Sequence, residues 1–287
     1  MTLNSTASII IQQMPMSTST IAVIMIISVM ISLIAVYLAR YRYHPPDVFV
    51  PKAAWLRAGI YFCACYLVAI ATGVFDALLS NPISTPEQIA DAAWWSWIVG
   101  LTLLVTVAYW GIWARYTLRF DRRLDVIPQI VFGLLWGTAS GLLFLSFYHI
   151  AQVVGSAWPT WQVWLLAYTS IAIWQGLWQD YYWDVYISPE HDSPWSIRFK
   201  VAATHIPNIT ACLIFFALYE NHAIFIALQT WALLGASLAM RMPAPWSRES
   251  PPPATRSFGL FGLKRASGYV PTDPENDPYL RAAHLRY

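Results

Sequence analysis

The feature of this sequence that most constrains its fold is a series of long, unbroken apolar stretches. A helix needs roughly 20 residues to cross the hydrocarbon layer of a membrane, which is about 30 Å thick. Stretches of about that length lie near residues 18–39, 54–79, 93–115, 127–154, 161–187, 197–219 and 223–241. Strands of a membrane barrel would instead alternate in character over about ten residues. The sequence therefore predicts an all-α, polytopic transmembrane bundle of about seven helices.

Composition and charge favour the same class of protein. Hydrophobic residues make up 57% of the 287 residues and charged residues only 11%, whereas an ordinary soluble domain has roughly 25% charged residues. The net charge of +2 gives no support to nucleic acid as a partner. The three cysteines lie in apolar runs, which indicates neither a disulfide framework nor a thiolate zinc site. We expect the lipid bilayer to be the main surroundings of the chain.

The basic residues predict the orientation of the bundle. Ten of the seventeen lie in loops or helix ends on one side: Arg40, Arg42, Lys52, Arg57, Arg115, Arg119, Arg122, Arg123, Arg198 and Lys200. The other seven follow the last apolar stretch, while Glu87, Asp91 and Glu220 lie on the opposite side. Because basic loops stay in the cytoplasm, we expect the N-terminus outside and the C-terminus inside. We expect an integral, multi-pass protein of the plasma membrane rather than of an internal membrane.

The chain divides into three expected parts. Residues 1–17 form an external segment, and residues 18–241 form the seven-helix domain. The first apolar stretch has no basic residue before it, which favours a retained helix over a cleaved signal peptide. Residues 242–287 form a proline-rich cytoplasmic tail in which we expect little packed structure.

The fourth apolar stretch carries a strip of small residues at intervals of four: Gly133, Gly137 and Gly141. This spacing places the three glycines on one helix face, where another helix can approach closely. The strip predicts a packing face inside the bundle, with a helix of a second chain as the alternative partner. The tail is the other expected site for a protein partner.

Polar residues gather at the expected inner ends of helices five and six. Asp180 and Asp184 lie four residues apart on helix five, and His205 and Asn208 lie three apart, about two turns inside helix six. Carboxylates and imidazoles can bind a divalent metal or act in acid–base chemistry. Candidate catalytic residues are Asp180, Asp184 and His205. Candidate metal ligands are Asp184, His191 and His205.

Tryptophans in the same part of helix five indicate a second kind of site. Trp174, Trp178 and Trp183 could line a pocket for a flat or long apolar ligand such as a quinone, carotenoid or sterol. The candidate ligand-binding residues are Gln175, Gln179, Trp183 and Asn208. A divalent metal and a lipophilic molecule are thus the two expected classes of cofactor.

Each part of this constellation also has a structural explanation. Asp180 and Asp184 could pair with Arg198 or Lys200 at the membrane edge. Pro207 weakens the helix beside His205 and frees a carbonyl group. On the other side of the membrane, His149 and His222 lie at helix ends where they could approach each other.

Three functions follow as alternatives, and the sequence leaves enzymatic activity open. The first is a membrane enzyme or cofactor-binding subunit with its site at helices five and six. The second is a non-catalytic interaction or assembly protein. The third is a receptor-like protein, because the seven-helix topology resembles that of G-protein-coupled receptors. Arg115 and Tyr116 match the receptor Arg-Tyr pair, but Ala114 replaces the usual acidic residue.

Overall fold

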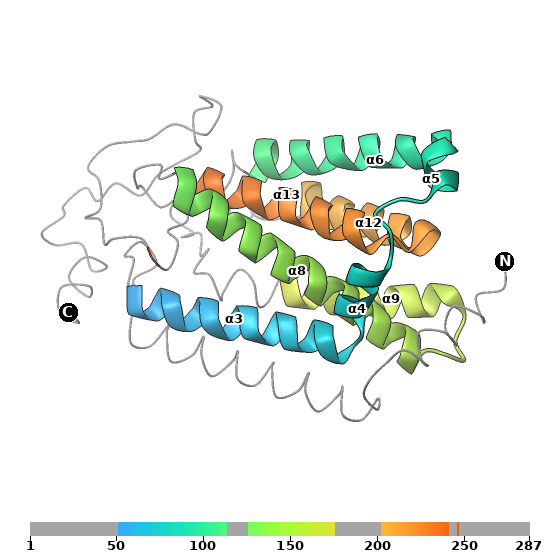
Figure 1. Cartoon of the computed structure of the whole chain (residues 1–287), viewed down its shortest axis with the longest axis horizontal. Coiled ribbons are helices and arrows are strands. Elements are labelled where there is room, and N and C mark those ends of the chain that lie inside the picture. The colour runs from blue at the N-terminus through green and yellow to red at the C-terminus, as the bar shows by residue number, and fades with distance from the viewer. Residues whose placement is uncertain (1–50, 114–125, 176–201, 241–245, 247–287) are drawn as a thin grey trace, which may run out of the picture.

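The computed structural model describes residues 51–113, 126–175, 202–240 and 246, and every regular element in these ranges is a helix (Figure 1). The elements are α3 (Pro51–Ala71), α4 (Val74–Ser80), α5 (Pro86–Ala90), α6 (Ala92–Val105), the π-helix η1 (Thr106–Trp113), α8 (Val126–Val154), α9 (Thr160–Ile173), α12 (His205–Tyr219) and α13 (His222–Met240). The predicted all-α class is confirmed for this part of the chain.

Among the described residues, two helical segments are long and apolar enough to cross a membrane, namely Ala92–Trp113 and Val126–Val154. A third span results if the bent pair Ala58–Ala71 and Val74–Ser80 is counted as one crossing, and α12 and α13 are shorter apolar helices. These segments correspond to expected spans of the sequence. The expected span at 18–39, the external segment and nearly all of the tail lie outside the described residues.

The expected helix over 54–79 is broken near its end. Helices α3 and α4 meet at an angle of 73°, and Gly73 between them has a φ of 75°. Glycine adopts this left-handed conformation without the steric cost of a Cβ atom. The hydroxyl of Thr72 donates to the carbonyl oxygen of Val68 at 2.8 Å, in addition to the backbone N–H of Thr72, which donates to the same oxygen at 2.9 Å. One glycine therefore bends the chain within an apolar stretch that looks continuous from hydropathy alone.

Helices α8 and α13 form the centre of the bundle. Helices α3 and α9 pack against α8, whereas α6 and η1 pack against α13 (Figure 1). The face of α8 against α13 carries the glycine strip Gly133, Gly137 and Gly141. A Cβ atom on Gly133 would lie 2.9 Å from the Cα of Leu234, and one on Gly141 would lie 3.1 Å from the Cα of Ile226. The two backbones are therefore nearly in contact within one chain.

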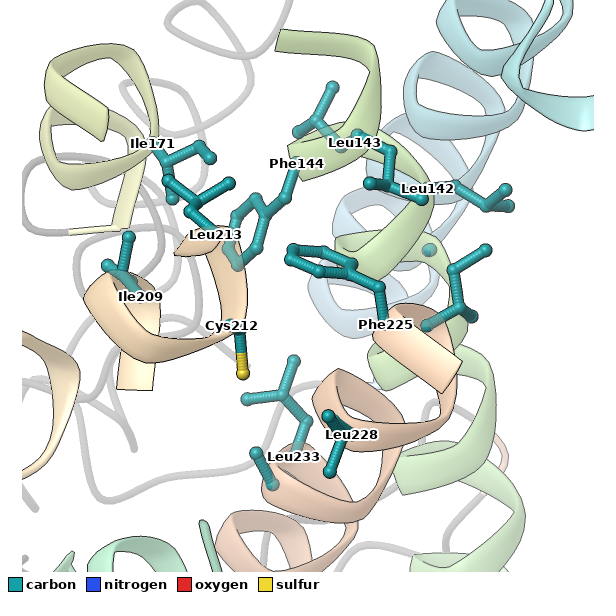
Figure 2. Packing of buried hydrophobic residues seen from close by; sticks show 14 of the residues in the cluster. Leu142, Leu143, Phe144, Ile171, Ile209, Cys212, Leu213, Phe225, Leu228 and Leu233 are labelled. Atoms are coloured by element: carbon teal, nitrogen blue, oxygen red, sulfur yellow. The ribbon is translucent and has the colours of Figure 1, made fainter. Parts of the chain in front are cut away.

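Apolar side chains from four helices fill the space beside this contact. Figure 2 shows them meeting: Leu142, Leu143 and Phe144 of α8, Ile171 of α9, Ile209, Cys212 and Leu213 of α12, and Phe225, Leu228 and Leu233 of α13. Large apolar side chains also remain exposed on the outside of the helices, including Leu103, Val107 and Leu165. Extensive exposed apolar surface is typical of contact with another apolar phase, which agrees with a membrane protein.

The α8–α13 contact predicts that Gly137→Ala destabilises the fold. The added Cβ would overlap the Cα of Thr230, so the two helices must separate at a cost of about 1–3 kcal/mol. In the control Gly100→Ala, the Cβ meets no atom within 4 Å, and stability should rise by up to about 1 kcal/mol from helix propensity. Thermal unfolding in detergent measures both. A Gly137→Ala protein at least as stable as the wild type would contradict this packing.

A buried polar cluster as the candidate functional site

Five polar side chains meet inside the bundle, far from its apolar surface. They come from four segments of the chain and are Tyr109 of η1, Gln175 just after α9, His205 and Asn208 of α12, and Gln229 of α13. Each is at most 6% exposed. We call these five residues the Tyr109 cluster.

The phenol oxygen of Tyr109 is the centre of this cluster. It lies 2.8 Å from Nδ1 of His205, 3.2 Å from Nε2 of Gln175 and 3.4 Å from Nδ2 of Asn208. The two amide nitrogens donate to the phenol oxygen, so its one proton is directed at His205. Nδ1 of His205 therefore accepts, which assigns the proton of the neutral ring to Nε2.

The network continues from this centre into α13. Nδ2 of Asn208 also donates to Oε1 of Gln229 at 3.3 Å. The thiol of Cys212, one turn further along α12, donates to Oδ1 of Asn208 at 3.2 Å. Gln175 Nε2 lies 3.0 Å from Nδ1 of His205 as well. Hydrogen bonds thus connect α9, η1, α12 and α13 at one depth of the bundle.

Aromatic rings enclose the imidazole of His205. The ring centroid of Trp113 lies 4.5 Å from that of His205 and 6.1 Å from that of Tyr109, with Trp113 and Tyr109 stacked. Both aromatic residues belong to η1. A π-helix holds more residues per turn than an α-helix and frequently occurs at functional sites. Trp174, the neighbour of Gln175, is also buried and packs near Tyr61 of α3.

His205 is the first residue of α12. The sequence predicted a helix from about 197 with His205 two turns inside it. Ala202 and Ala203 are helical and Thr204 interrupts the helix, while residues 197–201 lie outside the described residues. Pro207 lies in the first turn of α12, where proline is tolerated because no N–H is needed. His205 and Asn208 consequently stand at the beginning of α12, and Thr204 precedes them with a non-helical φ of −121° and ψ of −66°.

Three of the predicted site residues come together in this cluster, namely Gln175, His205 and Asn208. The other candidates, Gln179, Asp180, Trp183, Asp184 and His191, lie outside the described residues. Sequence reasoning missed Tyr109 and Gln229. Gln229 could have been noticed as an amide within an otherwise apolar helix, but Tyr109 is one of many aromatic residues and carries no distinguishing pattern.

Two amide atoms of the cluster retain hydrogen-bonding capacity. Within the described ranges, neither Oε1 of Gln175 nor Nε2 of Gln229 has a hydrogen-bond partner, although both atoms are buried. A buried polar group without a partner costs about 1–3 kcal/mol. The cluster therefore presents one acceptor and one donor that a further group can satisfy.

The chemical character of the cluster favours hydrogen bonding over metal binding. A phenol, an imidazole and three amides are neutral groups, whereas hard divalent metals prefer carboxylate oxygens. In the part of the chain that the structure describes, no three His, Cys, Asp or Glu residues are grouped so that they could hold a metal. Metal binding that involves Asp184 and His191 stays a prediction of the sequence.

The central position of Tyr109 predicts that Tyr109→Phe destabilises the fold by about 1–3 kcal/mol, because buried amide and imidazole groups lose their shared partner. Tyr168→Phe on α9 is the matched control. That residue is partly exposed, and its hydroxyl has no hydrogen bond within the described ranges. Chemical denaturation in detergent compares the two. Equal stability of the two variants would mean that the hydroxyl of Tyr109 does not stabilise the fold.

Comparisons with known proteins give no match: no protein-family model fits this chain, and neither a curated protein nor a solved structure is significantly similar to it. Function is therefore inferred from the geometry and chemistry of the Tyr109 cluster.

Proposed function

We propose that this chain is a seven-helix integral membrane protein, with its N-terminus outside, that binds a lipophilic molecule with a hydrogen-bonding head group at the Tyr109 cluster. The observation that supports this proposal best is a pair of buried amide atoms that have no hydrogen-bond partner among the described residues, Oε1 of Gln175 and Nε2 of Gln229. They lie in one hydrogen-bonded network whose imidazole packs against an indole ring.

The cost of polar groups in a membrane interior supports a functional role for the cluster. Such groups are expensive in lipid and usually mark ligand or ion sites. A network that is only partly satisfied is less stable than a complete one. A ligand that completes the network recovers this free energy on binding, so binding energy is available without any charged residue.

The free donor and acceptor define the class of head group. A carbonyl oxygen of the ligand can accept from Nε2 of Gln229, and a ligand hydroxyl can donate to Oε1 of Gln175. A flat ring between these groups would pack against indole faces such as that of Trp113. A quinol meets both needs, because one of its hydroxyl oxygens can accept from Nε2 of Gln229 and its other hydroxyl can donate to Oε1 of Gln175, whereas the oxidised quinone has no donor for Oε1. Its apolar tail would extend into the bilayer. Gln179 and Trp183 are proposed to extend the same site.

This proposal predicts saturable binding of a short-tailed quinol to the detergent-purified full chain. Quenching of tryptophan fluorescence reports binding close to the indole rings. Gln175→Leu should weaken the affinity about fivefold to tenfold through the loss of one hydrogen bond. Gln162→Leu at the opposite end of α9 should leave the affinity unchanged. No saturable quenching, or equal affinities of the two variants, would refute the proposal.

The proposed topology has its own test. A fluorescent protein fused after Tyr287 should fluoresce in cells, because the C-terminus is proposed to lie in the cytoplasm. An epitope before Met1 should be labelled by an antibody on intact cells. Labelling of the N-terminal epitope only after permeabilisation would contradict the proposed orientation.

A further inference from the structure

Two histidines meet at the end of the bundle opposite the Tyr109 cluster. Nε2 of His149, near the end of α8, lies 3.2 Å from Nε2 of His222, the first residue of α13. The rings are perpendicular, with an interplanar angle of 86°, and only 3% and 7% exposed, respectively. The prediction from the sequence that these two residues approach each other is confirmed.

Each imidazole also faces a backbone carbonyl through its other nitrogen. Nδ1 of His149 lies 3.4 Å from the carbonyl oxygen of Thr72, and Nδ1 of His222 lies 3.0 Å from that of Glu220. A carbonyl oxygen can only accept, so both Nδ1 atoms must carry protons to make these contacts favourable. In neutral rings, both Nε2 atoms then present lone pairs to each other.

Neutral tautomers cannot satisfy all three contacts. The three contacts are Thr72 carbonyl to His149, His149 to His222, and His222 to Glu220 carbonyl. Each contact needs one proton, but two neutral imidazoles supply only two. Moving either proton to the central gap directs an Nδ1 lone pair at a carbonyl oxygen. A cation between the two Nε2 atoms removes the conflict, because both lone pairs then coordinate it.

We propose that His149 and His222 bind a metal ion of the imidazole-preferring class, with Zn²⁺ as the representative. Ligating histidines typically donate their other N–H to a backbone carbonyl or a carboxylate, which is the arrangement of both rings here. For a tetrahedral zinc with Zn–N distances of about 2.0–2.1 Å, two ligand nitrogens are about 3.3–3.4 Å apart. The observed separation of 3.2 Å is close to that value.

Two backbone carbonyls beside the pair favour positive charge, whereas burial of both rings and the N-termini of α4 and α13 oppose it. The carbonyls of Thr72 and Glu220 lie at the C-terminal ends of α3 and α12, where the helix dipole is negative. The N-terminus of α13 opposes this effect. Phe216 covers the pair, with its ring centroid 4.9 Å from that of His222. Within the described ranges no third His, Cys, Asp or Glu completes a metal-binding group.

Titration of the detergent-purified full chain with Zn²⁺, followed by calorimetry, tests this inference. We expect a site whose affinity falls at least about tenfold in both His149→Gln and His222→Gln. His205→Gln, which alters the Tyr109 cluster, should retain it. Zinc should also raise the unfolding temperature of the wild type, because a ligand that binds the folded state stabilises it, and should not do so in His149→Gln.

Absence of zinc binding, or equal zinc affinity in the wild type and the two pair variants, would overturn the inference. A pair that holds only a shared proton would give the first of these results. The outcome is independent of the proposed quinol site, because quinol binding is measured by another signal and depends on Gln175 rather than on His149.

Discussion

The close approach of α8 and α13 at the glycine strip determines where the polar groups of this bundle lie. In lipid, hydrophobicity gives helices little reason to associate, and backbone packing through small residues takes its place. At one end of the α8–α13 contact, His149 lies opposite His222. Further along the contact, α13 is held so that Gln229 joins the Tyr109 cluster.

The other side of α13 is held by a second close contact. The indole of Trp110 lies over Gly235, where a Cβ atom would overlap the ring, and it stacks on Trp231 at a centroid distance of 4.4 Å. Nε1 of Trp110 donates to the carbonyl of Trp231 at 3.1 Å, and Nε1 of Trp231 donates to the hydroxyl of Thr106 at 2.8 Å. These contacts fix η1 against α13 and so position Tyr109 beside His205.

Hydrogen bonds between hydroxyl groups hold α3 against α8. The hydroxyls of Tyr61 and Ser140 are 2.6 Å apart, and those of Thr72 and Ser146 are 3.1 Å apart. Bonds of this kind contribute about 0.6 kcal/mol each in a membrane protein. They nevertheless fix the register of α3, which sets the carbonyl of Thr72 against His149. Small polar contacts thus orient the groups that carry the proposed chemistry.

The helical class and the approximate limits of several helices were predictable, because a membrane-spanning helix needs about 20 consecutive, mainly apolar residues. The corner at Gly73 and the interruption at Thr204 were not, since each depends on the backbone conformation of one residue. The meeting of Gln175, His205 and Asn208 followed from their position on adjacent helix ends. Tyr109 and Gln229 could not be assigned to the site, because their role arises from helix packing between distant parts of the chain.

The central claim is that a lipophilic ligand completes the Tyr109 cluster. The most direct test is an electron cryo-microscopy map of the unmodified chain in lipid nanodiscs that contain a quinol under reducing conditions. The account predicts non-protein density beside Trp113, within hydrogen-bond distance of Oε1 of Gln175 and Nε2 of Gln229. A map in which protein side chains satisfy both amide atoms, with no additional density between them, would contradict it.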